Sequence, residues 1–400
     1  MSYDVAAFRA GFPALQTGTA YFDGPGGSQV PTAVAEAVAR TMTAGLSNRG
    51  SVTASERQAD AVVVGARQAV GDLLHVPPQG VVFGRSMTSL TLEFARTLSR
   101  TWDRGDEVVV STLDHDANVR PWVLAAQAVG AVVRFADFDP ATGELTADHV
   151  AAVLSERTRV VALTGASNLI GTRPPLAHIA ERVHEVGALF FVDGVHLAAH
   201  AMVDVAAIGA DLFACSPYKF LGPHCGIVAG RPDLLETLRP DKLLASSDAV
   251  PERFELGTLP YELLAGTTAA IEVLASLGGG SGSSRVGRLQ DGMAAVERHE
   301  DGLRSLVEDG LAALPGVSLH SRAAHRTPTL LVTFDGRDAK DAHRFLAARG
   351  VNAPAGSFYA LGPSKALGLG IDGGLRIGLA PYSNDDDVQR LLDGLRAFLA

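Results

Sequence analysis

The most informative reactive side chain of the sequence is the amine of Lys219, in the segment Cys215-Ser216-Pro217-Tyr218-Lys219. Upstream, Asp193 ends the apolar run Leu189-Phe190-Phe191-Val192. A lysine amine forms a Schiff base (an aldimine) with an aldehyde. A cofactor held in this way also needs donors for an anionic phosphate and an acid for its ring nitrogen. The two segments therefore predict covalently held pyridoxal 5'-phosphate, although an aspartate after a strand, taken alone, is more often a helix cap.

Two further segments contain residue types that would complete such a site. Gly84 to Leu90 precedes a helical pattern, so Thr88 and nearby backbone N–H groups, such as that of Met87, would bind a phosphate at the helix N-terminus. This signal is weak alone because Ser and Thr cap most helices. The segment Asp114-His115-Asp116-Ala117-Asn118 follows another strand, where the His115 imidazole could stack on the cofactor ring and transfer protons. A single histidine is more often structural or exposed.

Composition narrows the function classes. The 400 residues allow one large domain with an appendage or two domains, and 47% are hydrophobic, which suffices for a sizeable core. A net charge of −10 argues against a nucleic-acid partner. Cys215 and Cys225 give neither a disulfide framework nor a zinc pattern, so we expect a reduced, cytoplasmic protein without a metal site. The start of the chain has no signal-peptide pattern, and no apolar run of about 18 residues predicts a membrane partner.

Short apolar runs alternate with helical patterns through the first two thirds of the chain. Continuous apolar strands between helices predict an α/β fold with a mostly parallel sheet that is covered on both faces. Ligands in such sheets bind beyond the carboxyl ends of the strands, so Asp193, Ser216 and the Asp114-His115 pair should meet at one edge. The predicted strands are Val108 to Ser111, Val132 to Phe135, Val160 to Leu163, Leu189 to Val192, Leu212 to Ala214 and Ile227 to Ala229.

The pattern changes at the polar, flexible segment Gly278 to Ser284. We expect residues 1–30 to pack on a small domain and the active site, residues 31–277 to form the large cofactor-binding domain, and residues 278–400 to form the small α+β domain. A surface loop is the alternative interpretation of this segment. Beyond it we expect a helix from Val286 to Leu314, a strand from Leu330 to Phe334, a helix from Ala339 to Arg349, a strand from Leu375 to Leu379, and a last helix that opens at Ser383.

Together these segments resemble the class V aminotransferase family of fold-type I pyridoxal-phosphate enzymes, and most closely its cysteine desulfurase-like branch. The resemblance implies a large domain with a mostly parallel seven-stranded sheet and a smaller C-terminal α+β domain. It begins at Tyr21 to Gly27, passes through Asp114 to Asn118, Ser167-Asn168, Asp193 to His196, Ser216 to Lys219 and Phe254 to Thr258, and ends at Leu375 to Gly378.

The resemblance also implies a role for each matching position. Lys219 would bond the cofactor and then act as general acid and base, with Asp193 at the ring nitrogen and His115 stacked on the ring. Arg376 would bind the carboxylate of a small amino-acid substrate, because a planar fork of donors suits that contact; the alternative is a surface arginine on a strand. The remaining contacts would come from Thr88, Ser216 and Tyr218 at the phosphate, Asn168 and His196 near the phenolic oxygen, Asn168 and Tyr359 at the substrate, and Gly257 and Thr258 of the neighbouring subunit in a homodimer.

The chain departs from the desulfurases in the loop before Arg376. Those enzymes carry a nucleophilic cysteine there, whereas this sequence has Gly356-Ser357-Phe358-Tyr359-Ala360. Persulfide formation needs a thiolate, which Tyr359 cannot provide. We therefore expect a lyase that works by β- or γ-elimination, such as a C–S lyase, with an aminotransferase, an epimerase or a non-catalytic cofactor-binding protein as alternatives. Tyr359 could donate a proton to the leaving group or pack between the domains.

Overall fold

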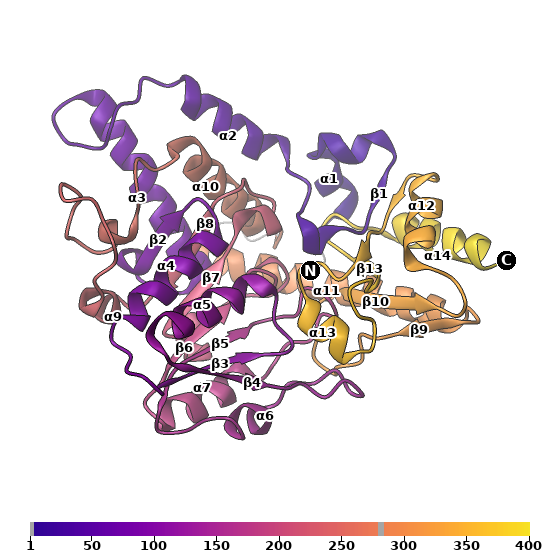
Figure 1. Ribbon diagram of the computed structural model, residues 1–400. Coiled ribbons are helices and arrows are strands. Elements are labelled where there is room, and N and C mark those ends of the chain that lie inside the picture. The colour runs from indigo at the N-terminus through magenta and orange to yellow at the C-terminus, as the bar shows by residue number, and fades with distance from the viewer. Residues whose placement is uncertain (1–3, 279–283) are drawn as a thin grey trace.

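The computed structural model describes residues 4–278 and 284–400. Its main feature is a seven-stranded sheet in which β8 runs antiparallel to both neighbours and the other pairings are parallel. This confirms the predicted α/β fold with a mostly parallel seven-stranded sheet (Figure 1). The strands in spatial order are β2 (Val81–Gly84), β8 (Gly226–Gly230), β7 (Leu212–Cys215), β6 (Leu189–Asp193), β5 (Thr158–Thr164), β3 (Glu107–Ser111) and β4 (Val132–Ala136).

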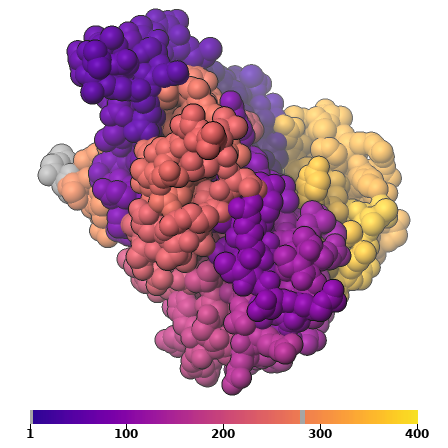
Figure 2. Space-filling model, turned by 60° about the vertical axis from the view of Figure 1, so that its left-hand side comes forward, coloured from indigo at the N-terminus to yellow at the C-terminus, as the bar shows by residue number. Residues whose placement is uncertain are grey.

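The central strands are apolar throughout because helices cover both faces of the sheet. Successive side chains of a strand point to opposite faces. Val109 and Val161 accordingly belong to a core with α3 (Ala54–Leu74), α7 (Leu176–Glu185) and α10 (Tyr261–Ser276), whereas Val108 and Val160 belong to a core with α4 (Met87–Ser99) and α5 (Arg120–Val129). The helices α2 (Thr32–Thr43) and α3 belong to the purple projection at the top of the molecule in Figure 2.

The predicted strands of this sheet are confirmed, and each is longer by one or two residues at an end. The sequence-based assignment missed β2, because Pro77 and Pro78 shortly before it are typical of a loop. Both β2 and β7 pair antiparallel with β8, so they share one direction. The carboxyl end of β2 therefore lies at the same edge of the sheet as the carboxyl ends of β6 and β7.

A second, four-stranded antiparallel sheet is formed by the C-terminal residues. Its strands in spatial order are β12 (Ala355–Gly356), β13 (Gly374–Gly378), β10 (Thr329–Phe334) and β9 (Val317–Leu319), and its helices are α11 (Arg285–Ala312), α12 (Ala339–Ala347) and α14 (Asp385–Leu399). The N-terminal strand β1 (Ala20–Tyr21) pairs in parallel with β11 (Val351–Asn352), so the N-terminal segment packs against the C-terminal part of the chain (Figure 1). The short α13 (Leu361–Ala366) follows the loop after β12.

The predicted start of the last helix at Ser383 is wrong. Asn384 is the N-cap, because its side chain accepts a hydrogen bond from the N–H of Asp387, and the helix begins at Asp385. Three aspartates in its first turn match the positive end of the helix dipole, as expected. Residues 279–283 of the predicted break lie outside the described residues, and the domain limits stay a prediction. No helix of the described chain has the length and apolarity needed to cross a membrane.

The turn that follows β6 is closely packed against β7. An added Cβ on Gly194 would lie 1.8 Å from Cζ of Phe213, and the Phe213 ring is fully buried. We predict that Gly194→Ala lowers the free energy of unfolding by about 1–3 kcal/mol, because overpacking forces neighbours to shift. Gly65→Ala on α3 is the matched control, since nothing lies within 4 Å of its added Cβ. Denaturant titration measures both, and an unchanged midpoint for Gly194→Ala would contradict the packing.

Candidate active site at the carboxyl edge of the large sheet

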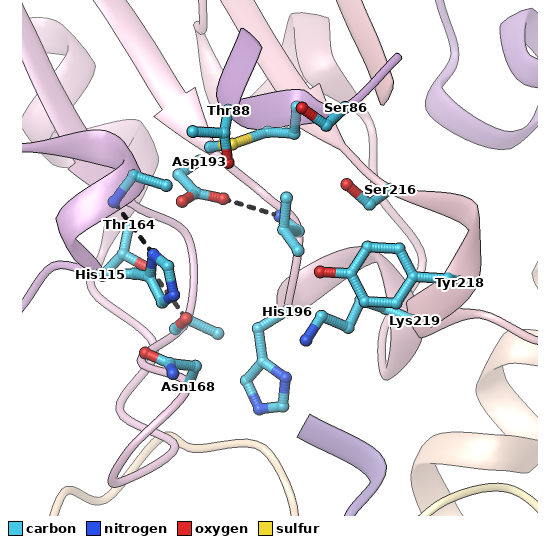
Figure 3. A pocket seen from close by; sticks show the side chains of 14 residues that line it. Ser86, Thr88, His115, Thr164, Asn168, Asp193, His196, Ser216, Tyr218 and Lys219 are labelled. Carbon is cyan, nitrogen blue, oxygen red and sulfur yellow. Dashed lines mark hydrogen bonds between the residues drawn. The ribbon is translucent and has the colours of Figure 1, made fainter. Parts of the chain in front are cut away.

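The predicted cofactor residues meet at the carboxyl ends of the strands (Figure 3). They line a cavity of about 90 Å³ that adjoins a more open cavity of about 610 Å³, and both cavities include His115 and Lys219. Phe358, Tyr359 and Arg376 line the larger cavity. The predicted residues around the smaller one are Met87, Thr88, His115, Asn168, Asp193, His196, Ser216, Tyr218 and Lys219.

The N-terminus of α4 forms one wall of the smaller cavity. Ser86 caps this helix: its hydroxyl accepts a hydrogen bond from the N–H of Ser89, and its N–H donates to the Ser89 hydroxyl. The first N–H groups of a helix have no partner within the helix and attract anions. Because Met87 and Thr88 stand in this first turn and Ser216 and Tyr218 line the same cavity, the wall fits a phosphate group.

Asp193 is a buried carboxyl at the carboxyl end of β6. Its Oδ1 accepts a hydrogen bond from the N–H of Val195, and it forms no ion pair with any residue that the structure describes. Burial raises the pKa of Asp193 to about 6, while the Val195 hydrogen bond and the charge of Lys219 act in the opposite direction. A buried carboxylate of this kind gains stability from a cationic partner, and a protonated pyridine nitrogen fits that need.

Lys219 ends the short helical turn Pro217–Lys219 that follows β7, and its amine points into the cavity (Figure 3). The Nζ atom donates a hydrogen bond to the carbonyl oxygen of Pro25, a contact that sequence patterns did not predict. Burial, together with the charge of Arg376, lowers the pKa of Lys219 to about 7, and the charge of Asp193 acts in the opposite direction. The amine is therefore substantially neutral near pH 7, which is the form that attacks an aldehyde.

His115 is a neutral imidazole beside the two cavities. Its Nδ1 accepts a hydrogen bond from the N–H of Ala117, which places any ring proton on Nε2. Burial lowers the pKa of His115 to about 4, and the charges of Lys219 and Arg376 contribute. The ring of Tyr359 lies 5.6 Å from the His115 ring, and 77% of the Tyr359 surface is exposed, which is more than packing between domains would leave.

Asn168 and His196 each present a buried polar atom without a hydrogen-bond partner. The Nδ2 of Asn168 donates to the carbonyl oxygen of Phe358, whereas its Oδ1 has no partner. The Nε2 of His196 lies 3.0 and 2.9 Å from the hydroxyls of Thr327 and Thr329, whereas its Nδ1 has none. Unpaired buried polar atoms are rare in native structures. Both side chains line the cavity, so they fit contact with a hydroxyl-type oxygen of a ligand. Such an oxygen donates a hydrogen bond when it is protonated and accepts one when it is ionised.

Arg376 lies on β13 and is 3% exposed, so the alternative interpretation, a surface arginine, is wrong. Its Nη1 donates to the carbonyl oxygen of Asn168 at 3.1 Å, and its Nε has no partner. Arg376 forms no ion pair within the described part of the chain, and the charge of Asp23 raises its pKa. Burial lowers the pKa of Arg376, which still leaves a cation at neutral pH that lacks a carboxylate.

Gly257 and Thr258 are not in this site. Both are exposed, and neither lines the two cavities. The segment before them is fixed by Glu255, which receives two hydrogen bonds of 2.8 Å from Arg67 and one of 2.9 Å from the N–H of Phe83. Contact between this segment and the cofactor of a partner subunit stays a prediction.

The comparisons with known proteins agree with this geometry. Residues 20–391 match the family model of aminotransferase class-V. The chain belongs to the class V aminotransferase family. It is 32% identical to the uncharacterized protein MT3887 of Mycobacterium tuberculosis over 99% of both chains, and 30% identical to a cysteine desulfurase of Dickeya dadantii over 98% of this chain and 96% of that protein. Its structure is similar to that of the cysteine desulfurase CsdA of Escherichia coli, with a TM-score of 0.88, 29% identity and complete coverage of both chains.

These findings confirm the predicted family, its cysteine desulfurase-like branch and its cofactor, pyridoxal 5'-phosphate. The protein is a pyridoxal-phosphate-dependent enzyme. The described residues contain no group of three or more His, Cys, Asp or Glu side chains that could hold a metal ion. The roles of the single site residues remain proposals.

Asp114 is a buried carboxyl that sequence analysis named only as a neighbour of His115. It accepts hydrogen bonds from Nδ2 of Asn118 and from the hydroxyl of Ser111. Burial raises its pKa from 3.8 to about 8, and the charge of Asp193 adds to this effect. Asp114 is therefore protonated at neutral pH, and it supports the segment that carries His115.

We predict a pH dependence of stability that Asp114→Asn removes. Because the folded-state pKa is higher than the unfolded one, this carboxyl stabilises the fold fully below pH 4 and loses that contribution as the pH rises to about 8. The difference in the free energy of unfolding between wild type and Asp114→Asn should fall by up to about 1.4 kcal/mol per pH unit in this range. Urea titrations of both proteins at several pH values measure this difference. A difference that does not change with pH would contradict the burial of the Asp114 carboxyl.

Proposed function

We propose that this protein is a lyase that acts on a small α-amino acid by β- or γ-elimination, such as C–S bond cleavage, without a protein persulfide. The observation that carries the proposal is the buried, unpaired guanidinium of Arg376 in the same cavity as the Lys219 amine. An unpaired buried charge is costly, and a carboxylate removes most of that cost. An α-amino acid supplies the carboxylate together with the amine that replaces Lys219.

Neither cysteine is suited to carry sulfur. Cys215 is fully buried on β7 and Cys225 is 2% exposed, and neither lines the two cavities of the site. Burial raises the pKa of Cys215, and it raises the pKa of Cys225 to about 11. The nucleophilic form of cysteine is the thiolate, which both environments disfavour. These properties support a reaction that differs from the persulfide chemistry of desulfurases.

The remaining side chains divide the chemical work. When bound, pyridoxal phosphate supplies an electron sink for negative charge at the α-carbon of the amino acid. The Arg376 fork holds the carboxylate, and the Asp193 carboxylate balances a positive ring nitrogen. The amine of Lys219 would remove the α-proton of the substrate, because a pKa of about 7 suits a general base at neutral pH. The Tyr359 hydroxyl, which lies beside His115 at the open cavity, donates a proton to the leaving group.

We further propose a homodimer in which Gly257 and Thr258 complete the phosphate site of the partner subunit. Both residues are exposed, and neither lines the cavities of its own chain. The buried Arg67–Glu255 pair holds the segment that precedes them. This arrangement supports a role in which Gly257 and Thr258 contact a partner subunit.

We predict that the purified holoenzyme converts a cysteine-type or homocysteine-type substrate to a 2-oxo acid and ammonia in equal amounts without an added amino acceptor. Arg376→Met should lower kcat/KM on the order of 100-fold or more, because charge-assisted hydrogen bonds to the carboxylate are lost. Cys225→Ala is the control and should keep the wild-type rate. The measurements are coupled assays for both products.

Other outcomes identify the alternatives. Dependence of turnover on an added 2-oxo acid would indicate an aminotransferase, and loss of optical activity without ammonia would indicate an epimerase. Loss of activity in Cys225→Ala would restore the persulfide mechanism. No turnover with any amino acid, in spite of bound cofactor, would favour a non-catalytic protein.

A further inference from the structure

The loop before α13 contains two consecutive residues in the left-handed region of backbone space. Phe358 has φ 52° and Tyr359 has φ 57°, and neither is a glycine. Such a conformation costs of the order of 1–3 kcal/mol per residue and persists only where surrounding contacts impose it. Strained backbone of this kind clusters at functional sites. The contacts that hold the loop therefore indicate which function its conformation serves.

Hydrogen bonds from the large sheet's loops hold both strained residues. The Nδ2 of Asn168 donates to the carbonyl oxygen of Phe358 at 3.0 Å, and the N–H of Asp116 donates to the carbonyl oxygen of Tyr359 at 2.7 Å. A third bond, of 2.8 Å, runs from the N–H of Ala360 to the carbonyl oxygen of Ser357 and closes the turn. The loop is therefore fixed over the cavity and does not form a free arm.

The strained conformation places the Phe358 ring on the guanidinium of Arg376. The Cζ atom of Arg376 lies 3.6 Å from the ring centroid. One edge of the guanidinium is occupied as well, because Nη1 donates to the carbonyl oxygen of Asn168. Nε remains without a partner, and Arg376 lines the larger cavity. One face and one edge of the guanidinium are thus covered, which leaves the Nε side for a ligand.

We propose that Phe358 is a positioning residue, whose ring fixes the plane of Arg376 so that the free edge of the guanidinium meets the substrate carboxylate. This inference rests on the proposed carboxylate-binding role of Arg376. A cation over an aromatic face is stabilised electrostatically, most strongly where water is excluded. The bidentate contact needs both donors in the plane of the carboxylate, so a ring that fixes this plane selects amino acids over amines.

The test compares two unreactive ligands that differ only in the carboxylate. L-2-aminobutyrate and propylamine are titrated into the holoenzyme, and their dissociation constants are read from the cofactor absorbance, without turnover. Phe358→Leu should weaken L-2-aminobutyrate about 3- to 30-fold, the range of a buried cation–π contact, and change propylamine less than about 2-fold. Phe358→Tyr keeps the aromatic ring and should bind L-2-aminobutyrate with the affinity of the wild type.

The chain offers a matched control for the loss of an aromatic ring beside an arginine. The Cζ atom of Arg349 lies 3.5 Å from the centroid of Phe345, on α12 and outside both cavities. Phe345→Leu removes the same kind of contact and should leave both dissociation constants unchanged. A melting curve of each variant shows whether it is folded at the temperature of the titration.

The outcomes separate this inference from the proposed function. If Phe358→Leu weakens both ligands equally, or weakens neither, the positioning role is wrong. If Arg376→Met abolishes the advantage of L-2-aminobutyrate over propylamine while Phe358→Leu preserves it, only the positioning role fails. If Arg376→Met preserves that advantage, the carboxylate-binding role of Arg376, and with it the proposed function, fails.

Discussion

The structure depends on the burial of ionisable side chains at the carboxyl edge of the large sheet. Burial disfavours the charged form of each group, so the pKa of Asp193 rises to about 6 while those of Lys219 and His115 fall to about 7 and about 4. Arg376 stays cationic without a carboxylate partner in the described chain. Bound pyridoxal phosphate and an amino acid would supply the opposite charges, so binding of these ligands should stabilise the fold.

The two sheets contribute different parts of this electrostatic arrangement. Strands β6 and β7 end at Asp193 and just before Ser216, and the antiparallel β8 allows β2 to deliver the start of α4 to the same edge. The C-terminal sheet contributes Arg376 from β13. The N-terminal segment joins them, because Pro25 contacts Lys219 and β1 pairs with β11. The residues proposed to bind the cofactor therefore lie mostly at the large sheet, and Arg376, proposed to bind the substrate carboxylate, lies on the small one.

Sequence patterns predicted those features that depend on local chain properties. Continuous apolar runs revealed most strands of the large sheet, and reactive residues placed directly after such runs had to meet at one edge. The strand β2 was missed because Pro77 and Pro78 shortly before it are typical of a loop, and β9 was missed because Ser318 interrupts its apolar residues. The helix start at Asp385 was missed because Ser383 and Asn384 are both good caps, and only packing decides between them.

Contacts between distant segments could not be predicted in the same way. The left-handed backbone of Phe358 and Tyr359 is imposed by Asn168 and Asp116, which lie far away in the sequence. The buried pair of His200 and Glu300, at 2.8 Å, likewise joins residues a hundred positions apart. Such contacts follow from tertiary packing, which overrides the local preferences of the residues involved.

The central claim is that Lys219 bonds the cofactor as an amine whose pKa burial has lowered. The most direct measurement adds pyridoxal phosphate to cofactor-free protein and follows the absorption band of the covalent complex as a function of pH. The account predicts that its rate of formation rises with a midpoint near pH 7, and that Lys219→Arg forms no band that borohydride can fix to the chain. A borohydride-fixed band in Lys219→Arg, or a midpoint near the ordinary lysine value of about 10.4, would contradict it.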